Sequence, residues 1–76
     1  MAIIEILDHR EEGWHKLTSP DLPGFFIVAP DDKIESAYAD IPQAIELLYL
    51  NNKQQKVSVS LRQASDRLRQ YSVEPK

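Results

Sequence analysis

The chain of 76 residues contains no cysteine. Disulfide bonds and thiolate metal sites are therefore excluded, and the absence of cysteine fits a reducing compartment. The opening stretch MAIIEILDH is too short for a signal peptide and lacks its basic residues. No apolar run approaches the roughly 20 residues that a membrane-spanning helix needs. We therefore expect a cytoplasmic protein that makes no contact with a membrane.

Glycine is also scarce, and two glycines cannot supply a G-x-G-x-x-G turn or a phosphate-binding loop. His9 and His15 have no hydroxyl or thiol nucleophile beside them, and they lack the H-x-x-x-H spacing of a zinc pair. If residues 10–13 form a hairpin loop, Asp8 faces His15 across an exposed tip. We expect no catalytic residue, no cofactor and no metal, and a His15→Ala variant that folds almost normally.

The charges are divided unevenly along the chain. Residues 1–50 carry ten acidic and three basic side chains, whereas residues 51–76 carry two acidic and six basic ones. This polarity suits either a basic protein partner for the acidic part or nucleic acid for the basic part. A domain of this size buries only about 60% of its unfolded surface, so a partner subunit is a common source of the missing burial.

The first half of the chain predicts three strands. Residues 2–9 are rich in isoleucine, residues 14–19 follow a polar loop, and residues 25–29 are apolar and aromatic. The connection between the last two strands contains Pro20, Asp21, Pro23 and Gly24. Proline cannot continue a ladder, and Leu22-Pro23-Gly24-Phe25 fits a type II turn in which Gly24 supplies a positive φ. We interpret this segment as structural, with a ligand-binding loop as the alternative.

The second half predicts a helix and a further strand. Asp32 and Glu35 have the spacing of a capping box, and apolar residues then recur at helical spacing as far as Leu48. Pro42 lies inside this pattern without breaking its phase, which favours one helix kinked near residues 38–42 over two short helices. Residues 56–62 alternate as a strand, and residues 63–76 fit either a short helix or a frayed continuation.

These elements predict an α+β fold. Their order is strand, strand, strand, helix, strand, which gives an antiparallel sheet with one amphipathic, proline-kinked helix on one face. Residues 1–62 form the domain, and residues 63–76 form a basic, partly flexible C-terminal segment.

The stretches GWHKLTSPDLPGFF and DDKIESAYADIPQAIELLY resemble the HicB-like antitoxin domain. The matching residues are Gly13 and Trp14, the run from Pro20 to Gly24, and Ala44 to Glu46. The resemblance covers roughly residues 3–62, and it is closest to small stand-alone HicB-related domains of uncharacterised function. It implies a helix laid on one sheet face, in a truncated ribonuclease H fold without that fold's catalytic acids.

The resemblance also implies a function. HicB-like antitoxins bind and block HicA, a small basic ribonuclease toxin, and they usually add a C-terminal DNA-binding domain. The residues after Arg62 are too few for that domain. We therefore predict a non-catalytic protein-interaction module that acts as a homodimer, binds a basic toxin-like partner, or does both. The alternative is a nucleic-acid-binding protein that uses its basic C-terminal segment.

The candidate contact residues follow from these two hypotheses. The run at residues 44–50 is apolar on nearly all sides, and the strand at 56–62 is free of proline, so both call for cover by a second subunit. The interface candidates are Leu47, Tyr49, Leu50, Val57, Val59 and Leu61. The candidate nucleic-acid contacts are Arg62, Arg67 and Arg69. The aromatic side chains Trp14, Phe25, Phe26, Tyr38 and Tyr49 are expected to pack in the core or in an interface.

Overall fold

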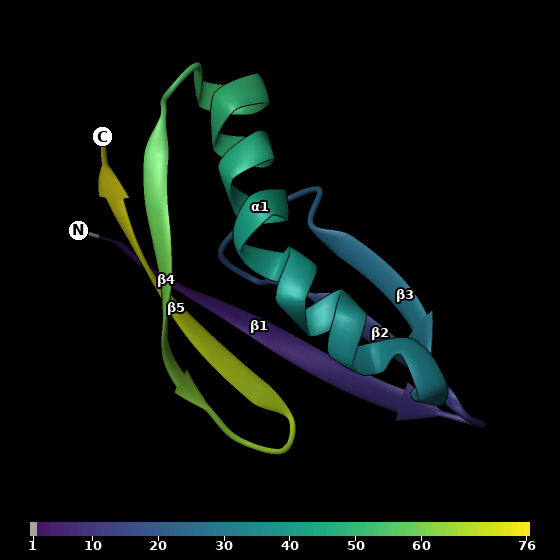
Figure 1. Ribbon diagram of the computed structural model, residues 1–76. Helices are drawn as coiled ribbons and strands as arrows, with labels where there is room; N and C mark the ends of the chain where they lie inside the picture. Colours follow the sequence, from purple (N-terminus) through teal and green to yellow (C-terminus); the bar gives the residue numbers. More distant parts are fainter. Residues whose placement is uncertain (1) are drawn as a thin grey trace.

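The computed structural model describes residues 2–76, which fold into an antiparallel five-stranded sheet with a helix against one face (Figure 1). In chain order the elements are β1 (Ala2–Glu11), β2 (Trp14–Thr18), β3 (Phe26–Pro30), a 3-10 turn (Asp31–Lys33), α1 (Ile34–Lys53), β4 (Val57–Ala64) and β5 (Leu68–Pro75). The expected α+β class is confirmed. None of the helices formed by residues 2–76 is long and apolar enough to span a bilayer.

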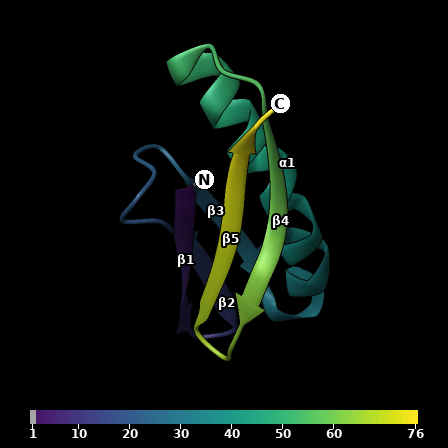
Figure 2. The same cartoon turned by 90° about the vertical axis from the view of Figure 1, so that its left-hand side faces the viewer.

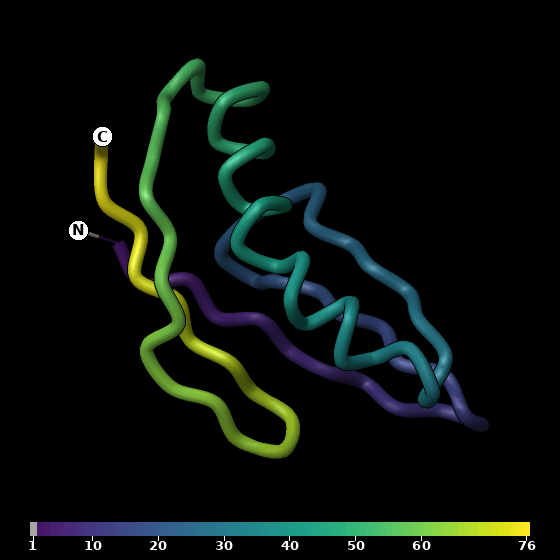
Figure 3. Tube along the Cα trace, viewed as in Figure 1, coloured from purple at the N-terminus to yellow at the C-terminus, as the bar shows by residue number. Residues whose placement is uncertain are grey.

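The predicted order of elements is wrong at its end, because a second strand follows the helix. β5 lies between β1 and β4, and the sheet runs β3-β2-β1-β5-β4. β5 is antiparallel to both neighbours, with Tyr71 opposite Ile4 on one side and Leu61 on the other. Figure 3 shows the trace of β5 running beside β1 and β4. The segment expected to be partly flexible therefore supplies an inner strand of the sheet.

The hairpin between β1 and β2 is tighter than predicted. Its turn has two residues, Glu12 and Gly13, with φ of 50° and 81°, as in the type I′ turns that match strand twist. His15 therefore lies opposite Arg10, and Leu17 lies opposite Asp8. The predicted pairing of Asp8 with His15 is wrong by two positions. Because side chains alternate along a strand, a shift of two leaves both residues on the face that was expected.

The proline-rich connection between β2 and β3 is the type II turn that the sequence predicts. The N–H of Phe25 donates to the carbonyl of Leu22 at 3.1 Å, and Gly24 has φ of 91°. Asp21 has a further role, since its carboxylate accepts the backbone N–H of Glu5 at 2.9 Å. The loop side chain thus satisfies a β1 donor at the point where β2 has ended.

Helix α1 is continuous from Ile34 to Lys53 and contains Pro42. Its buried residues are spaced three and four apart and face the sheet: Ile34, Ala37, Ile41, Ile45 and Tyr49. No side-chain cap hydrogen bond is formed at its start, where the 3-10 turn leads in instead of the expected capping box. Gln54, with φ of 51°, directly follows the last helical residue, Lys53, and ends the helix. The kink at Pro42 stays a prediction.

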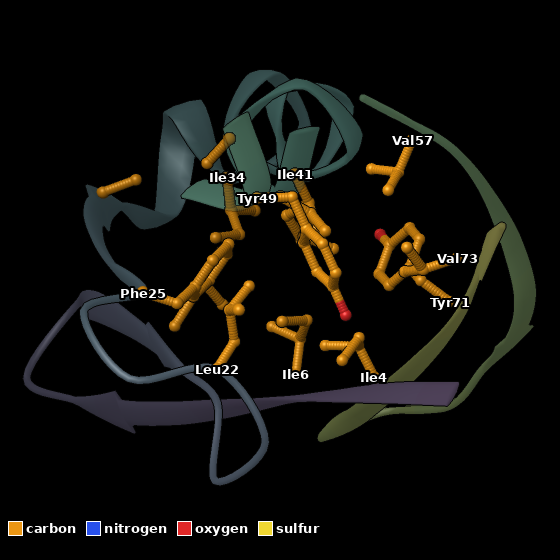
Figure 4. Close-up of a cluster of buried hydrophobic side chains, with 14 residues drawn as sticks. Ile4, Ile6, Leu22, Phe25, Ile34, Ile41, Tyr49, Val57, Tyr71 and Val73 are labelled. Carbon is orange, nitrogen blue, oxygen red and sulfur yellow. The ribbon is translucent and has the colours of Figure 1, made fainter. Parts of the chain in front are cut away.

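The core fills the space between α1 and the inner face of the curved sheet (Figure 4). Its fully enclosed side chains come from every layer of the fold: Ile6, Leu17, Ile41, Ile45 and Tyr71. Figure 2 shows α1 packed on one side of the sheet. The sheet face that points away from α1, which we call the open face, is therefore not covered by the helix.

Candidate functional site

A polar cluster closes the core at the end where β1, β2 and α1 meet. Nδ1 of His15 lies 2.9 Å from Oδ1 of Asp8, and Nε2 lies 2.6 Å from Oδ1 of Asp31. The hydroxyl of Tyr38 donates to the other Asp8 oxygen, and Nε of Arg10 lies 3.7 Å from that same oxygen. Asp8 and His15 are each only 5% exposed. The expectation that this pair is open to water is therefore wrong, although the hairpin tip at residues 11–14 is exposed.

His15 joins two acidic side chains, because each of its ring nitrogens lies within hydrogen-bond distance of a carboxylate, that of Asp8 or that of Asp31. Burial raises the pKa of Tyr38 above its usual value, and the hydrogen bond to Asp8 raises it further. The guanidinium of Arg69 lies 3.9 Å from the centre of the Tyr38 ring. Tyr38 therefore keeps its proton at neutral pH, with the Asp8 carboxylate at its hydroxyl and the Arg69 guanidinium over its ring.

The cluster has the residue types of acid–base chemistry, but its groups are occupied with one another. Within residues 2–76, every buried side-chain nitrogen and oxygen has a hydrogen-bond partner. No serine, threonine or lysine side chain contacts His15 through a hydrogen bond there, and no group of three or more potential ligands could hold a metal ion. The arrangement joins β1, β2 and the start of α1, which is a structural role.

The predicted interface residues are divided by the structure. Tyr49 and Val57 are buried in the core of the chain itself, and Val59 is partly buried against it. Leu47, Leu50 and Leu61 are exposed at 50%, 42% and 51%. Leu47 and Leu50 border a hollow with Gln43 and Val57, beside the start of β4. The three exposed leucines are thus the candidates that remain available for a partner.

The open face carries exposed aromatic side chains that the sequence analysis expected to be covered. Trp14 is 53% exposed and Phe26 is 60% exposed, whereas the adjacent Phe25 is buried. Phe25 closes the turn and is buried, whereas Phe26, the first residue of β3, lies on the open face with Val28, because side chains alternate along a strand. Alternation through FFIVA was the sequence feature that could have identified Phe26.

A hollow of about 820 Å³ lies on the β1–β2 part of the molecule. Leu7, His9, Trp14, Lys16, Val28 and Arg67 are among the residues that line it. Among its charged lining residues, the acids Glu11 and Glu12 balance the bases Lys16 and Arg67, whereas Asp8 and Arg10 direct their side chains toward the His15 cluster. The hollow therefore has neither the positive charge of a phosphate-binding groove nor a strongly negative one.

The three arginines proposed for nucleic-acid contact do not form one surface. Arg69 is stacked on Tyr38 on the helix side of the sheet. Arg62 is exposed at the irregularity in β4 between Leu61 and Gln63, and Arg67 borders the hollow of the open face. Sequence reasoning also missed Asp31, Tyr38 and Arg10 as partners of the His15 cluster, because only the packing of α1 on the hairpin brings them together.

Comparison with known proteins identifies no relative: no family model matches the chain, and no significant match was found among the curated proteins or the solved structures.

Proposed function

We propose that the protein is a non-catalytic protein-interaction module, similar in kind to HicB antitoxins, that acts as a homodimer and binds a basic toxin-like partner. The observation that carries this proposal is the group of exposed leucines, Leu47, Leu50 and Leu61, around the open edge of the sheet. In the described residues the ring nitrogens of His15 are already hydrogen-bonded to Asp8 and Asp31, which is consistent with a role in binding.

β4 supplies a ready template for a second strand. It is an edge strand of eight residues without proline. The N–H of Lys76 donates to the carbonyl of Lys56 at 3.0 Å, so these two residues form a hydrogen-bonded pair. Along an antiparallel ladder such pairs alternate with pairs whose N–H and C=O groups point away from the partner strand. Ser58 and Ser60 therefore direct their backbone groups toward β5, whereas Val57, Val59 and Leu61 direct theirs outward. An unpaired row of this kind favours association with another strand.

The exposed leucines extend this edge into an apolar contact. Leu47 and Leu50 are one helical turn apart on α1, beside the start of β4. A two-fold axis beside β4 would bring the same edge and the same leucines of two subunits together, so each patch would cover its copy. Burial of the leucines would remove apolar surface from water at about 25 cal/mol per Å².

The charge distribution supports a basic second partner. The net charge is −3, so the surface as a whole is acidic even though basic side chains of β5 lie beside β1. A negative surface accelerates encounter with a positive protein and disfavours acidic competitors. We expect the dimer to inhibit RNA cleavage by a small basic ribonuclease of the HicA type.

Sedimentation equilibrium at micromolar concentration tests the dimer against a monomer of 8.7 kDa. Leu50→Lys should raise the dissociation constant, because an unpaired ammonium is costly to bury. Val59→Pro should do the same by removing an outward N–H while leaving the β4–β5 bonds in place. Asn51→Lys is the matched control, since it adds the same charge at an exposed neighbouring position. Equal association by all four proteins would exclude this interface.

The nucleic-acid alternative has less support. Arg69 is engaged with Tyr38, and the remaining candidates Arg62 and Arg67 lie in different places. Binding driven by phosphates weakens steeply with salt, whereas an apolar contact does not, so a salt titration separates the two functions.

A further inference from the structure

The open face is divided into a polar half and an apolar half. Residues directly opposite one another on neighbouring strands share a face, so Ser58, Ser60 and Ser72 line the β4–β5 half. The β1–β2–β3 half carries Trp14, Phe26 and Val28, exposed at 53%, 60% and 48%. An apolar sheet half with aromatic side chains has the composition of the centre of a protein interface.

Three rows of side chains cross the apolar half. The middle row, which we call the apolar row, consists of Leu68, Leu7, Thr18 and Phe26, which lie opposite one another in turn on β5, β1, β2 and β3. His9 and Lys16 are paired in the row on one side of it, and Glu5 and Gln70 are paired in the row on the other side. Bases and an acid therefore flank an apolar centre on opposite sides.

This arrangement is complementary to itself. A two-fold axis along the apolar row would lay Leu7 and Phe26 of one copy on the same residues of the other. His9 and Glu5 lie two residues to either side of Leu7, about 7 Å each, so the axis would place His9 of one copy over Glu5 of the other. Packed sheets cross at about 30°, which displaces that pair by roughly 3.5 Å, less than the spacing between strands.

The charge balance decides among the possible partners. A polyanion such as single-stranded nucleic acid needs a basic groove around the aromatic side chains, whereas on this face His9 and Lys16 are accompanied by Glu5 and Glu11. The same balance gives a basic protein no preference for this half of the sheet. Alternating signs around an apolar centre suit a surface that carries the same alternation, namely a second copy.

We propose that the open face is a self-association surface, on which two copies of the chain stack their sheets about a two-fold axis through the apolar row. It is separate from the β4 edge, so it does not depend on the proposed β4 dimer. Together the two contacts would join four chains, and each contact alone would join two.

Phe26→Lys tests the open face, with Ser36→Lys on an exposed turn of α1 as the matched control. Loss of an aromatic side chain at the centre of an interface should raise the dissociation constant by about 30-fold or more. Trp14 is the only tryptophan and lies on this face, so dilution of the wild type should shift its emission to longer wavelength. Leu50→Lys should leave that emission change in place.

A charge exchange tests the orientation of the two sheets. Glu5→Lys and His9→Glu should each weaken association, and the double variant should restore it. Within one chain these side chains are four residues apart on β1, about 13 Å, which exceeds the screening length of about 8 Å in physiological salt. Restoration therefore reports a contact between copies.

The two variants report separately on the two surfaces, and a smaller assembly for each variant would show that both contacts form. If Phe26→Lys dissociates the assembly and Leu50→Lys does not, the open face is the interface and the β4 proposal fails. If only Leu50→Lys dissociates it, the open-face proposal is overturned and the β4 dimer stands. An unchanged mass and tryptophan emission for Phe26→Lys would also overturn the open-face proposal, as would a wild-type monomer at micromolar concentration.

Discussion

Asp21 connects two parts of the sheet through a single carboxylate. β2 ends before Pro20, so the N–H of Glu5 on β1 has no strand partner on that side, and Asp21 accepts it instead. The N–H of Asp21 in turn donates to the hydroxyl of Ser19 at 3.2 Å. The P-D-L-P-G motif therefore has a structural explanation for its aspartate as well as for its prolines and glycine.

Gly24→Ala should reduce the free energy of unfolding by about 1 kcal/mol or more, because Gly24 has φ of 91°. The nearest side-chain atom, Cδ2 of Leu48, would lie 3.7 Å from an added Cβ, so backbone strain and not collision is the cause. Urea denaturation measures the loss. Gly24→Asn, which tolerates positive φ better, should lose less, and an equal loss for both variants would contradict this explanation.

His15→Ala should destabilise the fold by about 1–3 kcal/mol, because it leaves Asp8 buried with one strong partner fewer. The burial of the cluster thus reverses the expectation from sequence that this variant is nearly neutral. Gln55→Ala, at an exposed position of the loop after α1, is the control in thermal denaturation. Equal melting temperatures for the two variants would show that the cluster contributes nothing.

Tyr38 should make the fold sensitive to alkali. Its pKa is raised above 10.0 in the folded protein, so the unfolded chain loses this proton first as the pH rises. The folded state therefore keeps its full stability below about pH 10 and loses part of it as the pH rises through the folded pKa. Tyr38→Phe should remove this contribution, so the difference in unfolding free energy between wild type and variant should narrow above about pH 10. A constant difference would contradict it.

At the scale of elements, the sequence predicted the first three strands, the type II turn and the helix. Their patterns are local: alternation for the strands, Pro23-Gly24 for the turn, and spacing of three and four for α1. The hairpin register failed because the positive φ at Glu12 was not foreseen, and glutamate gives little indication of a two-residue turn.

β5 was ambiguous because two patterns compete within it. Leu68 and Tyr71 have helical spacing, whereas Tyr71 and Val73 alternate with Gln70, Ser72 and Glu74 as in a strand. The decision comes from long-range pairing with β1 and β4, which no local pattern contains. The same limitation hid the His15 cluster, since Asp31 and Tyr38 reach it only through the packed fold.

Tyr71→Ala should therefore destabilise the domain by about 3–5 kcal/mol, because Tyr71 is 1% exposed at the centre of β5. For a domain of this size such a loss is a large part of the total stability. Circular dichroism during urea titration measures it, with Glu74→Ala on the exposed end of β5 as the control. A folded domain after removal of residues 63–76 would show that β5 is dispensable.

At the scale of the whole molecule, the acidic and basic parts of the sequence are interleaved in space. β5, which carries Arg69, lies directly beside β1, and Arg10 of β1 forms an ion pair with Asp66 at 2.9 Å. The basic C-terminal segment is therefore part of the sheet. The division of the chain after residue 62 stays a prediction, and it falls within β4, not at a boundary of the sheet.

We expect no measurable binding of a single-stranded RNA or DNA oligonucleotide in about 0.15 M salt, because the net charge is −3 and the arginines are dispersed. Fluorescence anisotropy with a labelled oligonucleotide measures this. Tight binding that Arg62→Ala and Arg67→Ala both weaken would instead establish the nucleic-acid function.

The inner position of β5 also determines when the domain can fold during synthesis. Gln70 contacts Glu5 across a separation of 65 residues, and pairings of such length are slow to form. Until residues 68–75 leave the ribosome, β1 has one side unpaired, and that side belongs to the isoleucine-rich stretch from Ala2 to Leu7. Until then the nascent chain exposes an aggregation-prone strand, a situation in which chaperones bind.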